Sequence, residues 1–263
     1  MFSDVKWHVR SVMDGFYKER KLLALILIWI VFFSYGSCRG LYDSYLQFYH
    51  VKISAADALI IFQGQVHFGI MLFPIFIFLV MKSGRDSLNV QRLMRYGDRK
   101  KMFRKQIWEG FGYAVIITVV MLAVETVFAR IMTGSFINWD QIDSLYYSRT
   151  GTGDEVGFLV ILAMIFGMYL VKFVQVLMLM EFLLWSPRYM PALWIVLVLL
   201  AGISSWKFDG YYQIFSVQTV SWNSPVRMGG AFLLGLFVIL AEYAVEARFI
   251  RKKDLYGEMN AGE

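Results

Sequence analysis

Long apolar stretches constrain the fold of this chain more than any other feature of its sequence. A helix needs about 20 apolar residues to cross the hydrocarbon core of a bilayer. Hydrophobic residues make up 58% of the chain and charged residues 17%, whereas a soluble domain has about 25% charged residues. One soluble core cannot bury so much apolar surface. We therefore predict an all-α membrane protein with six transmembrane helices, at 22–38, 58–81, 110–129, 158–180, 190–205 and 228–247.

Two of these spans are open to another interpretation. The first follows a basic leader and ends at Cys38, as a cleaved signal peptide or lipoprotein signal would, but Tyr35 stands where such cleavage sites have a small aliphatic residue. We expect this span to be retained. The fifth is bounded by Pro187 and Pro191, and we keep it because the charge distribution requires an even number of spans.

Basic side chains set the expected topology. Cytoplasmic segments of membrane proteins carry an excess of Lys and Arg. With the N-terminus inside, basic residues concentrate in 1–21, 82–106 and 248–263, and the outer segments carry few. We therefore expect a multi-pass protein of the cell membrane with both termini in the cytoplasm, and a basic cytoplasmic tail at 248–263.

The first 21 residues have the pattern of an amphipathic helix. Phe2, Val5, Val9 and Phe16 recur at helical spacing, with basic residues away from this stripe. A helix of this kind lies on the cytoplasmic leaflet with its apolar face in the lipid. The alternative is a basic flank that only sets the topology.

The segment 82–106 is the largest predicted cytoplasmic segment and is strongly basic. We expect a short helix over about 87–96, ended by Gly97. Asp98 is then placed to cap the next helix, which continues into the third span. The alternative is a loop that binds anionic lipid headgroups.

Catalytic and metal-binding motifs are not found. The sequence has no phosphate-binding loop, no Gly-x-Ser-x-Gly elbow and no His-Glu-x-x-His motif. It has one cysteine and three histidines, so it predicts neither a disulfide framework nor a metal cage. We expect no catalytic residue and no cofactor in this chain.

Polar residues inside the spans are candidates for a pathway, because they are costly in hydrocarbon and usually face protein or water. The alternative is that they join helices together. We expect Gln63 and His67 to share one helical face, and Glu125 and Glu246 to extend toward the lipid headgroups. Lys172 and Glu242 lie at equal depth in their spans, which predicts an ion pair. The candidate pathway residues are Gln63, His67, Lys172, Gln175 and Glu242.

The chain resembles the permeases of the ABC-2 type, the membrane subunits of bacterial ABC exporters. Three features carry this resemblance: the six-span layout with an amphipathic N-terminal helix, the run Arg95-Tyr96-Gly97-Asp98-Arg99-Lys100-Lys101, and the tail Arg251-Lys252-Lys253-Asp254-Leu255. The chain departs from the family in 206–227, which is short where many members have re-entrant helices.

The resemblance implies a partner ATPase, which would bind the ATP and Mg²⁺ and dock on 87–104. It also implies a second permease chain, and export of a peptide, an antimicrobial or another amphipathic substrate. A membrane-embedded enzyme or protease, or a non-transporting immunity or signalling protein, are the alternatives. The expected docking residues are Leu93, Met94, Arg95, Tyr96 and Arg99.

Overall fold

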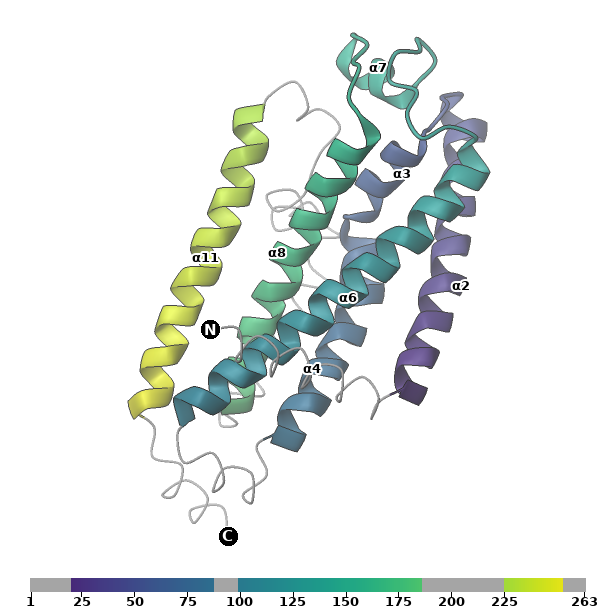
Figure 1. Cartoon of the computed structure of the whole chain (residues 1–263). Helices are drawn as coiled ribbons and strands as arrows, with labels where there is room; N and C mark the ends of the chain where they lie inside the picture. Colours follow the sequence, from purple (N-terminus) through teal and green to yellow (C-terminus); the bar gives the residue numbers. More distant parts are fainter. Residues whose placement is uncertain (1–19, 88–98, 186–224, 253–263) are drawn as a thin grey trace.

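The computed structural model describes residues 20–87, 99–185 and 225–252, and it is a bundle of helices (Figure 1). Four helices are long and apolar enough to cross a membrane, or five if one bent pair is counted as a single span. The chain is thus a multi-pass helical membrane protein. The elements are α2 (Arg20–Ser44), η1 (Tyr45–Tyr49), α3 (Ala55–Phe62), η2 (Gln65–Leu72), α4 (Phe73–Ser87), α6 (Arg99–Thr133), α7 (Leu145–Thr150), α8 (Phe158–Trp185) and α11 (Pro225–Lys252).

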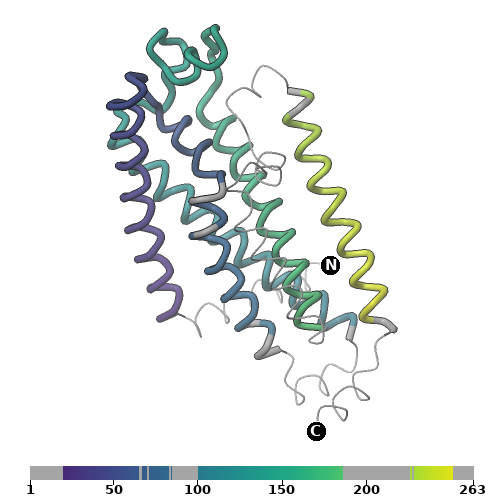
Figure 2. Tube along the Cα trace, turned by 180° about the vertical axis from the view of Figure 1, so that it is seen from behind, coloured from purple at the N-terminus to yellow at the C-terminus, as the bar shows by residue number. Residues whose placement is uncertain are grey.

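Helix α8 is central to the packing of the bundle. It packs against α3, α4, α6 and α11, and α2 packs on α6. Half of the apolar window of α8 is buried, against 17% for α2 and 11% for α11. Helices α2 and α11 flank the bundle (Figures 1 and 2) and present most of their apolar surface outward. The core between the helices therefore surrounds α8.

Four of the predicted spans are present as helices, but each helix is longer than predicted. Helix α6 covers the predicted third span and runs on at both ends, for 35 residues. At about 1.5 Å per residue it is longer than the roughly 30 Å hydrocarbon core. Its charged first turns therefore extend beyond the apolar layer. The predicted fifth span and residues 1–19 of the predicted N-terminal helix lie outside the described residues. So do residues 88–98 of the predicted docking segment, which is described only at its two ends, in α4 and α6.

The second span is broken, which corrects the prediction of one helix over 58–81. Helix α3 ends at Phe62 with Gln63 as its C-cap, and Gly64 is extended, with φ −70° and ψ 176°. The π-helical turns of η2 follow and lead into α4, and the two halves of the span differ in direction by 55°. Pro74 lacks an N–H and its ring clashes with the carbonyl four residues earlier, which favours an irregular helix before it. Gln63 and His67 therefore do not lie on one helical face.

The segment between α6 and α8 is a folded cap that contains the short helix α7. Gly134 and Gly151 have positive φ, 74° and 73°, and Gly151 ends α7. The rings of Trp139 and Tyr146 are both buried and stack at 4.4 Å. This cap lies over one end of the bundle (Figure 1), which we call the α7 end.

Candidate intramembrane polar site

The break in the second span is held by a buried lysine of the central helix. Lys172 is fully buried in α8, and its Nζ donates a hydrogen bond to the Gln63 carbonyl at 2.7 Å. That carbonyl belongs to the last turn of α3, where backbone acceptors lose their helical partners and the helix dipole favours a cation. The ammonium also lies 5.0 Å from the centre of the Phe68 ring. Lys172 therefore caps the shortened helix inside the bundle.

A second buried contact joins the break to α6. His67 Nε2 is hydrogen-bonded to Glu125 Oε1, and both side chains are buried. The rings of Phe33 and Phe62 lie 5.0 Å and 4.5 Å from the imidazole. The prediction that Glu125 extends to the headgroups is wrong, because its face of α6 packs inward. The break is thus tied to α8 through Lys172 and to α6 through Glu125.

Several buried polar atoms around this contact have no hydrogen-bond partner within the described residues. They include His67 Nδ1, Glu125 Oε2 and the hydroxyl of Tyr169. Tyr169 and Cys38 both interact electrostatically with Glu125, so they lie around the same carboxylate. Buried polar groups usually have a partner in protein or water. This set of donors and acceptors is therefore able to take a small polar ligand or waters.

The predicted ion pair between Lys172 and Glu242 is not formed. Glu242 Oε2 has no hydrogen-bond partner in the described parts of the chain, and the Lys172 ammonium is directed to the Gln63 carbonyl instead. Glu242 and Glu181 of α8 both lie close enough to Glu246 for their like charges to repel. Equal depth along two helices did not ensure that the side chains face each other.

The structure brings together three of the five predicted pathway residues, namely Gln63, His67 and Lys172. Gln175 is buried about one turn from Lys172 along α8. Glu246 is buried, with 4% of its surface exposed, which contradicts the prediction that it reaches toward the headgroups. Leu93, Met94, Arg95 and Tyr96 lie outside the described residues, and Arg99 begins α6.

The inward position of Glu125 was not predicted, although the spacing of buried residues along α6 indicates it. The buried residues Tyr113, Ile117 and Met121 precede it at steps of four along α6, so Glu125 continues the inward face of an α-helix. The role of Glu181 was also missed. It lies on the buried side of α8 with Met180 and Leu184.

The α7 end holds a separate set of polar contacts. Ser54 and Asp57 form a reciprocal cap at the start of α3, and Trp139 Nε1 donates to Asp57 Oδ1 at 2.9 Å. Lys52 Nζ lies 2.7 Å from Asp143 Oδ2. This bond lowers the pKa of Asp143 and raises that of Lys52, because each charge stabilises the other. These contacts join the linker before α3 to the cap.

Neither set of residues resembles a metal centre. Within the described ranges, no group of three or more His, Cys, Asp and Glu side chains is placed to hold a metal ion. Comparisons of the chain with protein-family models, with curated proteins and with solved structures gave no match.

Proposed function

We propose that this chain is the membrane-spanning permease subunit of an ATP-driven exporter. The observation that carries the proposal is the broken second span, whose break lies inside the bundle beside Lys172, His67 and Glu125. Discontinuous helices with polar groups at the break form the substrate sites of many transporters. Ionisable residues within spans are costly and usually mark a transport pathway.

In this proposal the substrate passes the break. The site combines ionisable groups with the rings of Phe33, Phe62 and Phe68, a lining suited to an amphipathic molecule such as a peptide or an antimicrobial. The break is also the place where the second span can change its bend. A bend of 55° held by a few side chains can move with less cost than a continuous helix.

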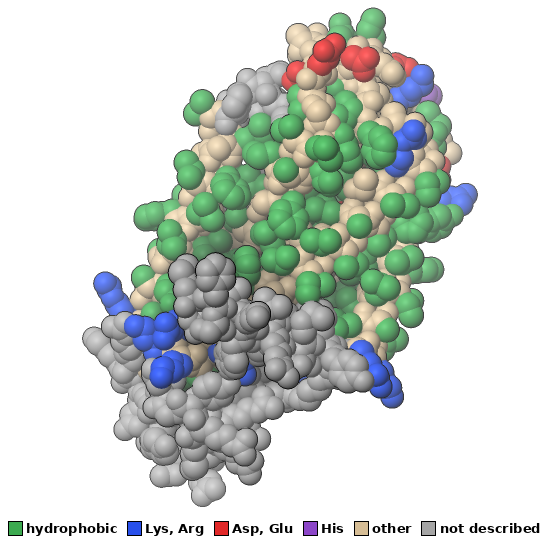
Figure 3. Space-filling model, viewed as in Figure 1, with side chains coloured by type: hydrophobic (Ala, Val, Ile, Leu, Met, Phe, Trp, Pro, Cys, Tyr) green, Lys and Arg blue, Asp and Glu red, His purple; other side chains and the backbone are tan. Residues whose placement is uncertain are grey.

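The proposed orientation places the α7 end outside the cell. Acidic side chains gather at that end with a few Lys and Arg side chains beside them, and further Lys and Arg side chains lie at the opposite end (Figure 3). The excess of basic residues belongs on the cytoplasmic side. The partner ATPase, which binds the ATP and Mg²⁺, then meets the chain at 87–104, next to the start of α6. Two permease chains, identical or related, complete the pathway.

The partner is tested by purification from native membranes. Tagged chain should bring down an ATPase, and the purified complex should hydrolyse ATP while the chain alone does not. Leu93→Asp and Tyr96→Asp place a charge on the apolar face of the proposed docking helix and should release the ATPase. Gln91→Asp makes the same change of charge off that face and serves as the matched control.

Each result has a definite meaning. ATP hydrolysis by the isolated chain would contradict the proposal that it is a permease subunit. An ATPase that stays bound to the Leu93→Asp/Tyr96→Asp variant would show that the docking segment is wrongly assigned. If no ATPase accompanies the intact chain, the alternatives of a membrane enzyme or an immunity protein are favoured instead.

A further inference from the structure

Three carboxylates lie between α8 and α11, toward the end of the bundle opposite the α7 end (Figure 1). Glu181 of α8 is 2% exposed and Glu246 of α11 is 4% exposed. Glu242 precedes Glu246 by four residues, so the two share one face of α11. Helices α8 and α11 pack against each other, and Glu246 lies within electrostatic reach of both other carboxylates. We call these three residues the acidic cluster.

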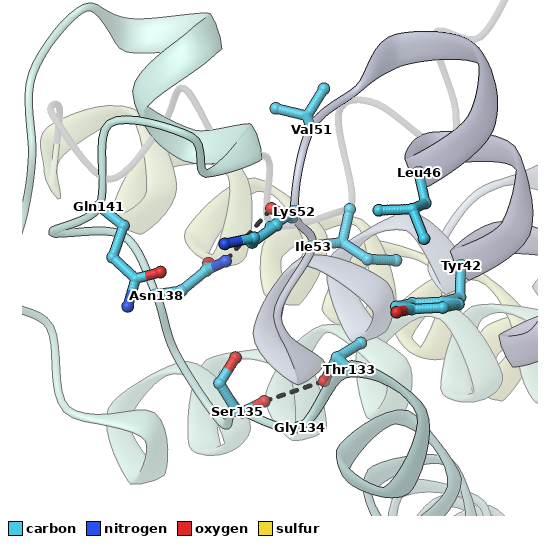
Figure 4. A pocket seen from close by; sticks show the side chains of 10 residues that line it. All are labelled: Tyr42, Leu46, Val51, Lys52, Ile53, Thr133, Gly134, Ser135, Asn138 and Gln141. Carbon is cyan, nitrogen blue, oxygen red and sulfur yellow. Dashed lines mark hydrogen bonds between the residues drawn. The ribbon is translucent and has the colours of Figure 1, made fainter.

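Each member of the acidic cluster has a buried oxygen without a donor. Oε2 of Glu181, Glu242 and Glu246 has no hydrogen-bond partner in the described part of the chain. The wall of the cavity at the α7 end is different, because there the Thr133 hydroxyl donates to the Ser135 carbonyl at 3.0 Å (Figure 4). Buried polar groups usually have a partner in protein or water. The acidic cluster therefore lacks the donors that would satisfy its oxygens.

The groups that face the cluster from α6 do not provide these donors. Glu109 acts on Glu181 as a further negative charge, and Lys105 is engaged with Glu109 at 3.4 Å. Tyr113 is the other titratable residue beside Glu181, in a small gap between the helices. The residues of α4 that line this gap, Val80 and Gly84, carry no charge. Basic residues described toward this end are exposed, namely Lys82, Lys100, Lys101, Arg104 and Arg248.

The space beside Glu181 decides which ligand the cluster can take. Gln106 lines the same gap and is 3% exposed, and its Nε2 has no hydrogen-bond partner among the described residues. The gap has no room for a water molecule, which would need about 10–15 Å³ of open volume. Within the described ranges, no three acidic, His or Cys side chains are placed to hold a metal ion. A proton needs no cavity, and it turns a bare carboxylate oxygen into a donor.

We propose that the acidic cluster is a proton-binding site that joins α11 to α8. With a proton bound, the carboxylic acid O–H of one helix donates to a bare carboxylate oxygen of the other. When the proton passes to the solution at that end, like charges face each other in apolar surroundings, where they repel strongly. The contact between α8 and α11 then loosens. This inference goes beyond the proposed function, because proton binding requires neither an ATPase nor transport.

Glutamine substitution separates protonation from shape. Glutamine has nearly the shape of a protonated glutamate, donates hydrogen bonds and carries no charge. The unaltered chain and Glu246→Gln are compared in phosphatidylcholine nanodiscs by hydrogen exchange over 240–250. Both are measured at the same pH, so the intrinsic exchange rates are equal. At about pH 8.5 the unaltered chain should exchange about tenfold faster than Glu246→Gln, and at about pH 5 the two should agree within about twofold.

Two further variants locate the effect. Glu181→Gln changes the cluster from the α8 side and should protect 240–250 in the same way. Glu155→Gln, at an exposed carboxylate of the cap, is the matched control and should exchange like the unaltered chain at both pH values. The unaltered chain gives a test that needs no variant. Its protection over 240–250, corrected for the intrinsic rates, should fall between about pH 5 and about pH 8.5.

Three results would overturn the proposal. Constant protection of the unaltered chain across this pH range would mean that no proton controls the contact. Faster exchange in Glu246→Gln and Glu181→Gln than in the unaltered chain at the higher pH would mean that the carboxylates stabilise the contact as anions. Loss of protection when Na⁺ is replaced by N-methylglucamine at constant pH would assign the cluster to a metal ion instead.

Discussion

His67 of the broken second span is hydrogen-bonded through Nε2 to the carboxylate of Glu125 in α6, with both side chains buried. Replacing one member leaves the other without its partner in an apolar environment. Glu125→Ala or His67→Ala should therefore lower the free energy of unfolding by about 3 kcal/mol or more. Reversible denaturation in mixed micelles would measure it.

The double variant His67→Phe/Glu125→Met is the sharper test of this contact. Replacing both polar groups with apolar ones should cost less than the sum of the two single replacements. Glu155→Gln, at an exposed carboxylate, is the control and should change little. Strict additivity would mean that the two side chains do not interact.

Lys172 should stabilise the break rather than only fill space. Lys172→Met keeps much of the side-chain length but removes the hydrogen bond to the Gln63 carbonyl. A hydrogen bond from a charged group contributes about 1.5–3 kcal/mol, so hydrogen exchange over 60–72 should speed up at least about tenfold. Met180→Leu, elsewhere in the core of α8, should leave exchange there unchanged. Unaltered exchange in Lys172→Met would mean that the break does not depend on this bond.

Gly110 should be required for the packing of α6 on α8. A Cβ at this position would lie 2.2 Å from Leu177 Cδ1 and within 3.1 Å of two further atoms of the same side chain. Gly110→Ala should therefore destabilise the bundle by about 1–3 kcal/mol. Gly229→Ala meets no atom within 4 Å and should be neutral or slightly stabilising, because Ala favours helices. Thermal unfolding of both variants provides the comparison.

The α7 end should lose stability in strong alkali. Burial, helped by the hydrogen bond to Asp154, raises the pKa of Tyr146 from 10.0 to about 12. Because the folded state holds this proton more tightly, its stabilising effect is complete below pH 10 and is lost as pH rises through about 12. The tyrosinate absorbance of the intact chain should show a late step that Tyr146→Phe removes. Tyr147→Phe is the control, and its curve should keep that late step.

The positions of the helices along the chain followed from the sequence more readily than the rotation of each helix toward its neighbours. Apolar length predicted spans at α2, α6, α8 and α11, because the requirement to cross a bilayer acts on each helix alone. Which residue faces which neighbour depends on rotation and packing. That is why Lys172 contacts Gln63 and not Glu242.

The break in the second span was missed for a local reason. Hydropathy averages over a window, so the stretch that contains Gly64 and Pro74 reads as one apolar segment. Gly and Pro at this spacing permit an irregular helix, yet many membrane helices contain both residues and remain continuous. The contacts that hold the bend come from residues more than 50 positions away, Glu125 and Lys172.

The linked backbone at the α7 end gives the bundle a fixed pivot. The linker before α3 is bonded to the cap through Lys52 and Leu145, so the helices that meet there cannot separate easily. Helix α6 extends from this pivot for 35 residues, or about 50 Å at 1.5 Å per residue. A rotation of only about 5° would then move its far end by roughly 4 Å. Near that far end Met102 and Phe103 pack against α8 and α11. A long helix held at the α7 end therefore works as a lever that passes its motion to both neighbours, at the end where the predicted docking segment joins it.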